Sequence, residues 1–137
     1  MVNSDENIFF SVVIPTFERP DDLRKCLKSL SVKRQQGSPK YEILVSDDSN
    51  SNRSKDMIKS EFPEIPWGVG KKNGPAGNRN AGVARAKGRW IVFLDDDCIA
   101  QEGYLEAYAK EIYSNPEILV LEGRIFPDRK RKTWAEG

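Results

Sequence analysis

Three consecutive carboxylates, Asp95–Asp97, come directly after the apolar run Trp90–Leu94. Adjacent carboxylates repel one another, and a divalent cation relieves that repulsion because Mg²⁺ and Mn²⁺ bind oxygen ligands. Side chains at alternate positions of an extended chain point the same way, so we expect Asp95 and Asp97 to share the ion. The competing interpretation is an acidic cap on a helix predicted over residues 102–113, but Asp97 lies several residues before that helix. The spacing therefore favours a Mg²⁺ or Mn²⁺ site.

The segment before this cluster is basic and rich in glycine. There is no Asp or Glu between Ile65 and Leu94, whereas Lys and Arg recur there, at Lys71, Lys72, Arg79, Arg85, Lys87 and Arg89. Within residues 74–82 (GPAGNRNAG), small side chains allow close approach of a ligand, and a predicted helix N-terminus favours anions. Glycine inside a helix is unfavourable by up to ~1 kcal/mol, so Gly77 and Gly82 indicate close packing or close ligand approach. Together with Arg79, a bidentate donor, the pattern favours a phosphate ligand over ordinary exposed charges.

A second acidic pair, Asp47–Asp48, follows the apolar run Tyr41–Val45. One carboxylate can accept hydrogen bonds from a base or a ribose, and the other can cap the following turn. The sequence Asp-Asp-Ser-Asn is equally ordinary turn composition, so both interpretations stay open at this point.

The elements that must position these groups alternate along the chain. Strands are expected over residues 8–14, 41–45, 67–69, 90–94 and 118–121, with the first ended by Pro15. Helices are expected over residues 20–32, 55–60 and 102–113, with another opened by Pro75 and closed by Gly88. Strands that are apolar on both faces predict an α/β fold, an open and mostly parallel sheet with helices on both faces. Ligands bind outside the carboxyl ends of such strands, so we expect the binding site to be formed by residues 15–19, 46–52 and 95–98.

Composition narrows the classes of function. The 137 residues are 38% hydrophobic and 31% charged, as expected for one soluble domain, and a net charge of +1 gives no argument for nucleic-acid binding. We find no apolar run of about 18 residues and no signal peptide, so we expect no membrane span and a cytoplasmic location. Two cysteines without histidine exclude a disulfide scaffold and a Cys/His zinc site. The absence of histidine also removes the commonest general base.

Taken in order, three segments resemble the nucleotide-binding, N-terminal portion of a family 2 glycosyltransferase with the GT-A fold. SVVIPTFERPDDLRKCLKSL resembles its opening strand and helix, and YEILVSDDSNS resembles its second strand with the acidic pair. GPAGNRNAGVARAKGRWIVFLDDDC resembles its helix, strand and DxD motif. The resemblance covers residues 8–125. It departs from the usual pattern at Glu18, where Asn is usual, and at Ser49–Asn50 in place of Gly-Ser, which leaves the donor open.

The resemblance implies a role for each matching residue. Asp97 would bind Mn²⁺ or Mg²⁺ at the diphosphate, with Asp95 beside it, and Asp48 would hydrogen-bond a uracil-type base, with Asp47 more structural. Nucleotide contacts would come from Pro15, Thr16, Glu18, Asp48, Arg79, Asp95 and Asp96. The implied activity is transfer, with inversion, of a sugar from a nucleotide-diphospho-sugar, most often a UDP-sugar, to a carbohydrate or lipid-linked acceptor.

Full-length enzymes of this family are much longer, and their catalytic base lies well beyond the DxD motif. Only 40 residues follow Asp97, and none matches the base-carrying motif, so we assign no base. Residues 1–137 are therefore expected to be one truncated donor domain without the C-terminal acceptor portion, and self-association stays open. The alternative is a non-catalytic nucleotide-sugar-binding or assembly module. A phospho-receiver domain is disfavoured because this sequence shows no matching lysine at a strand end. A nucleotidyltransferase is disfavoured because the loop after the first strand, PTFERP, contains no glycine.

Overall fold

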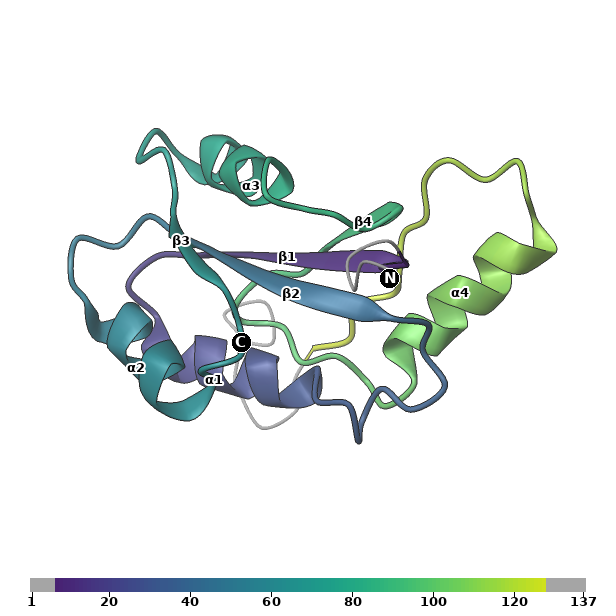
Figure 1. Cartoon of the computed structure of the whole chain (residues 1–137), viewed down its shortest axis with the longest axis horizontal. Helices are drawn as coiled ribbons and strands as arrows, with labels where there is room; N and C mark the ends of the chain where they lie inside the picture. The colour runs from purple at the N-terminus through teal and green to yellow at the C-terminus, as the bar shows by residue number, and fades with distance from the viewer. Residues whose placement is uncertain (1–6, 128–137) are drawn as a thin grey trace, which may run out of the picture.

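The computed structural model describes residues 7–127 and contains alternating strands and helices, as the sequence predicts (Figure 1). A proline and two acidic residues in its first turn favour the first helix, α1 (Pro20–Ser29), and an apolar stripe buries it against the sheet. The elements in chain order are β1 (Phe10–Thr16), α1 (Pro20–Ser29), β2 (Tyr41–Asp47), α2 (Arg53–Glu61), β3 (Trp67–Val69), α3 (Pro75–Val83), β4 (Trp90–Phe93) and α4 (Tyr104–Ser114).

The four strands form one sheet in the order β3-β2-β1-β4, and all of their pairings are parallel. In the register, Thr16 at the end of β1 lies beside Asp47 at the end of β2, and Val13 lies beside Phe93 of β4. The central strand β1 is almost wholly buried, as expected for a parallel strand covered on both faces. The carboxyl ends of β1, β2 and β4 therefore meet at one edge of the sheet.

Helices cover both faces of this sheet, which confirms the predicted α/β architecture. Helix α3 lies on one face, whereas α1 and α2 lie on the other (Figure 1). Gly82 explains how closely α3 approaches, because a Cβ atom there would lie 2.5 Å from Cγ1 of Val13. Of the two explanations offered by the sequence for this glycine, close packing is the correct one.

Several predicted boundaries were wrong, and α1 ends at Ser29 rather than at residue 32. Strand β1 does not end before Pro15; it continues through Pro15, which pairs in register with Ser46, to Thr16. Helix α3 ends at Val83 rather than at Gly88. Gly88 instead allows the chain to pass close to β1, because a Cβ atom there would lie 2.6 Å from the backbone nitrogen of Ser11. Its own N–H donates a 2.8 Å hydrogen bond to the Ser11 hydroxyl.

The strand predicted over residues 118–121 is absent. These residues have no regular structure, and Leu119 and Val120 are 87% and 85% exposed. An apolar run forms a strand only where a ladder partner and a buried face are available, and in the described part of the chain this run has neither. Among the helices within residues 7–127, none has the length and apolar character needed to cross a membrane.

Candidate functional site

A cavity of about 570 Å³ opens at the carboxyl edge of the sheet. Residues that follow three different strands line it, including Thr16 from β1, Asp48 after β2, and Asp95–Asp97 after β4. The N-terminal half of α3 closes another side with Pro75 and Arg79. The edge of the sheet that the sequence selected is thus the edge that holds the cavity.

The three carboxylates after β4 differ in their exposure to solvent. Asp95 and Asp97 are both exposed, and ligand atoms of Asp95, Asp97 and Cys98 all lie within 4.8 Å of one another. The two carboxylates that were expected to share an ion therefore lie close together. Asp96 points inward and is only 6% exposed, and its Oδ2 accepts a 2.8 Å hydrogen bond from the Thr16 hydroxyl. Two exposed carboxylates form a donor set that suits Mg²⁺ or Mn²⁺, which keep several water ligands.

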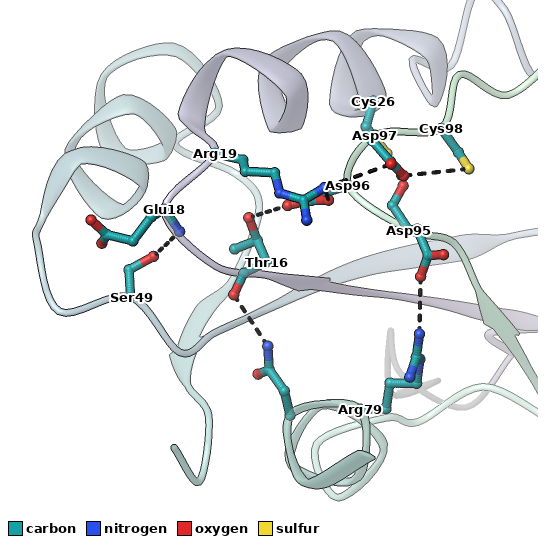
Figure 2. A network of polar contacts seen from close by, with 11 residues as sticks. Thr16, Glu18, Arg19, Cys26, Ser49, Arg79, Asp95, Asp96, Asp97 and Cys98 are labelled. Carbon is teal, nitrogen blue, oxygen red and sulfur yellow. Dashed lines mark hydrogen bonds and ion pairs between the residues drawn. The ribbon is translucent and has the colours of Figure 1, made fainter. Parts of the chain in front are cut away.

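Two arginines reach this acidic cluster from opposite faces of the sheet (Figure 2). Nη2 of Arg79, on α3, lies 3.1 Å from Oδ1 of Asp95. Nη1 of Arg19, just before α1, lies 3.4 Å from Oδ1 of Asp96 and 3.6 Å from Oδ2 of Asp97. Both arginine side chains also border the cavity. The two arginines therefore offset part of the negative charge of the cluster, and an anionic ligand in the cavity could contact both of them.

Burial is the main influence on the protonation of Asp96. It raises the pKa of the Asp96 carboxyl above its usual value, and the negative charge of Asp97 acts in the same direction. The hydrogen bond from Thr16 and the positive charge of Arg19 lower that pKa and so favour the carboxylate. These two partners are what make a largely buried carboxylate tolerable at this position.

The acidic pair at the end of β2 likewise has one buried and one accessible member. Asp47 is 2% exposed and accepts hydrogen bonds from the Trp67 indole at 3.0 Å and from the Ser49 N–H at 2.8 Å, so its role is structural. The Asp48 carboxylate lies at the cavity, where its Oδ1 accepts a 2.9 Å hydrogen bond from the backbone N–H of Lys72. Asp48 is thus the member of the pair that a ligand can reach.

Glu18 lies apart from the other predicted site residues. It lines a separate hollow, and its Oε1 accepts hydrogen bonds from the Ser51 N–H at 3.0 Å and the Ser51 hydroxyl at 2.8 Å. Those bonds lower the pKa of the Glu18 carboxyl. Its backbone N–H donates to Ser49, and its φ of 53° is left-handed. The large cavity gathers the other predicted residues, namely Pro15, Thr16, Asp48, Arg79, Asp95, Asp96 and Asp97.

Several cavity-lining residues were not among the predicted site residues, and the contacts of Arg19 and Asn78 are the most informative of them. Arg19 belongs to the segment after β1 that the sheet-edge rule selected, so its position and charge were an available signal. Asn78 on α3 had no such signal. It is buried, its Nδ2 donates a 3.2 Å hydrogen bond to the Thr16 carbonyl, and its Oδ1 has no partner among the described residues. It ties α3 to the end of β1.

Solved structures share this architecture. The S. aureus TarS 1-349 structure in complex with UDP matches with a TM-score of 0.68 and 24% identity, over 88% of this chain and 38% of that chain. The mannosyltransferase PcManGT from Pyrobaculum calidifontis, in complex with GDP-Man and Mn²⁺, matches with a TM-score of 0.64 and 18% identity, over 80% of this chain and 33% of that chain. Both likenesses show the fold, that of the GT-A glycosyltransferases.

Sequence comparison leads to the same group of proteins. The GalNAc(5)-diNAcBac-PP-undecaprenol beta-1,3-glucosyltransferase of Campylobacter jejuni is 37% identical over 92 residues, which are 64% of this chain and 29% of that protein. Across three curated relatives, the matched part of the chain spans 29%, 43% and 36% of their lengths. The family model described as glycosyl transferase family 2 matches residues 11–137, almost the whole chain. With the fold and the sequence in agreement, this chain belongs to glycosyl transferase family 2.

Proposed function

We propose that residues 1–137 form the donor-binding domain of an inverting glycosyltransferase that uses a UDP-sugar. The observation that carries this proposal is the single cavity in which Asp48, Arg79 and the exposed carboxylates Asp95 and Asp97 meet. A nucleotide-diphospho-sugar presents a base, a diphosphate and a sugar in line. The cavity offers an acceptor for the base, a guanidinium for phosphate and carboxylates for a metal.

The nucleotide would lie along the edge between β2 and β4. Asp48 would accept a hydrogen bond from the base, and Pro15 and Thr16 at the end of β1 would lie beneath it. Arg79 would contact the base or the diphosphate, and Asp95 and Asp96 would reach the ribose or the metal shell. The TarS structure in complex with UDP, which has the same fold, supports uridine as the nucleoside. Glu18 would act only indirectly, through the loop that contains Ser51.

Asp95 and Asp97 would hold the divalent ion, Mn²⁺ or Mg²⁺. When bound, such an ion supplies Lewis-acid stabilisation of the departing diphosphate. Asp96, which is buried against Thr16, would orient the two exposed carboxylates. The Mn²⁺ complex of the Pyrobaculum calidifontis mannosyltransferase supports a metal in this fold.

The acceptor side is a proposal of its own. The Campylobacter jejuni relative is named for an undecaprenol-linked substrate, which supports a carbohydrate or lipid-linked acceptor here. Residues beyond this domain would contribute the acceptor site and the general base. The proposed location is the cytoplasm, where nucleotide sugars are available. Self-association of the domain stays an expectation.

Calorimetric titration with UDP, GDP and CDP, with and without Mn²⁺, tests the donor site. We expect UDP to bind best and Mn²⁺ to tighten its binding. Loss of residues that merely orient a metal ligand lowers metal affinity roughly 10–100-fold, so Asp97→Asn should remove at least about tenfold of the Mn²⁺-dependent affinity. Asp56→Asn, which removes an exposed carboxylate from α2, is the matched control and should bind like the wild type.

Equal binding of all three nucleotides, without any effect of Mn²⁺, would contradict the proposal. Incubation of the 137-residue chain with a UDP-sugar and a candidate acceptor tests whether these residues contain the acceptor site and the general base. Donor binding with little or no transfer is the expected result for an isolated donor domain, and it is also the behaviour of a non-catalytic binding module. A robust rate of sugar transfer would show that the acceptor site and base lie within these residues.

A further inference from the structure

Arg19 contacts the acidic cluster and also lines the cavity. We propose that its guanidinium occupies the cluster before ligands bind, and that it turns to the diphosphate when a divalent ion binds at Asp97. Arg19 would thereby couple the binding of the metal to the binding of the nucleotide. This role rests on the proposed function, and it assigns to Arg19 a task that the family's sequence motifs did not indicate.

The contacts of Arg19 suit a cation that can be displaced. Nη1 contacts both Asp96 and Asp97, at 3.4 and 3.6 Å, which is longer than the 2.7–2.9 Å or so of a strong charge-assisted hydrogen bond. The side chains of Arg19 and Asp97 are 53% and 47% exposed, and ion pairs with that exposure contribute little stability. The contact with Asp97 can therefore be exchanged for another cation at small cost.

The backbone of Arg19 is held by the first turn of α1, whereas its side chain is half-exposed. Its carbonyl accepts a 3.0 Å hydrogen bond from the Leu23 N–H, which closes the first turn of α1. Its second partner, Asp96, is fixed by the Thr16 hydroxyl (Figure 2). Asp96 can thus keep one contact with the guanidinium as a pivot after Asp97 has been released.

Electrostatics determines the direction of this exchange. A divalent ion on Asp97 would lie close to the guanidinium, and two cations on one carboxylate repel each other. A diphosphate in the cavity offers Arg19 another anionic partner in place of Asp97, because the planar guanidinium can donate two hydrogen bonds to phosphate oxygens. Movement of Arg19 to the diphosphate relieves the repulsion and adds an ion pair, so each ligand should strengthen the binding of the other.

Binding of Mn²⁺ and UDP by the purified chain tests this role without any measurement of sugar transfer. Free Mn²⁺ is followed by electron paramagnetic resonance with and without UDP, for wild type, Arg19→Gln and Arg19→Lys. Without UDP, Arg19→Gln should bind Mn²⁺ more tightly than the wild type, because the competing cation is gone. The factor by which UDP tightens Mn²⁺ binding should fall at least about fivefold, the lower end of usual coupling factors. Arg19→Lys keeps the positive charge but cannot donate two parallel hydrogen bonds, so its coupling factor should lie between those of the wild type and Arg19→Gln.

Arg24→Gln is the matched control, since Arg24 pairs with Asp21 and Glu61 on the outside of α1 and does not line the cavity. It should bind both ligands like the wild type. If the wild type binds both ligands and Arg19→Gln has the same Mn²⁺ affinity and the same coupling, the role of Arg19 is wrong and the proposed function stands. Weaker Mn²⁺ binding by Arg19→Gln without UDP would also overturn it. A wild type that binds neither ligand would overturn the proposed function and this role together.

Discussion

The Thr16 hydroxyl donates a 2.8 Å hydrogen bond to Oδ2 of Asp96, across 80 residues of sequence. It joins the end of β1 to the segment after β4, at the edge where the cavity opens (Figure 2). The bond holds Asp96 inward, so that Asp95 and Asp97 on either side remain exposed. One buried contact therefore determines how three identical side chains are distributed between the interior and the site.

Thr16→Val should destabilise the protein. The substitution keeps the shape of the side chain but removes the hydroxyl donor of a largely buried carboxylate, which costs about 1–3 kcal/mol in the free energy of unfolding. Urea denaturation of the variant and the wild type measures this difference. Thr16→Ser restores the hydroxyl and should recover most of the loss. Equal unfolding free energies for the Val and Ser variants would show that the hydrogen bond contributes nothing.

The two glycines of α3 should respond oppositely to alanine. At Gly82 a Cβ atom would lie 2.5 Å from Cγ1 of Val13, and overpacking of this kind costs about 1–3 kcal/mol. At Gly77 the nearest atoms belong to the flexible side chain of Asn73, which can move away, so alanine should add up to ~1 kcal/mol of helix stability. Urea midpoints of Gly82→Ala and Gly77→Ala give the comparison. Stabilisation by both substitutions would mean that α3 is not held tightly against β1.

Glu18 should stabilise the fold only above acidic pH. The hydrogen bonds from Ser51 lower the pKa of its carboxyl below the ordinary 4.5, so the unfolded chain takes up the proton more readily than the folded chain. The stabilisation is present above that ordinary value and disappears as the pH falls through the lowered one. The difference in urea midpoint between wild type and Glu18→Gln should therefore be larger at about pH 7 than at about pH 3. Glu64→Gln, at another exposed position, controls for the loss of one charge. A difference that does not vary with pH would contradict this.

Much of the fold was predictable because its signals are local. The apolar runs around Val12, Leu44 and Val92 became β1, β2 and β4, and proline at 20 and 75 opened the helices as expected. Predictions failed where a distant part of the chain decides the outcome. Residues 118–121 had the composition of a strand but found no partner in the described structure, and Gly88 serves the approach to Ser11 rather than a helix end.

The amino-acid sequence by itself determined the α/β order and the edge of the sheet at which the cavity opens, and it predicted that Asp95 and Asp97 lie close together. Strand periodicity and alternation are properties of neighbouring residues, so they can be read along the chain. The tertiary structure alone decided that Asp96 turns inward, that Glu18 faces a separate hollow, and that Arg19 contacts the acidic cluster. Those directions depend on which long-range hydrogen bonds and ion pairs satisfy each charge once the strands have been brought together, and this information is not local.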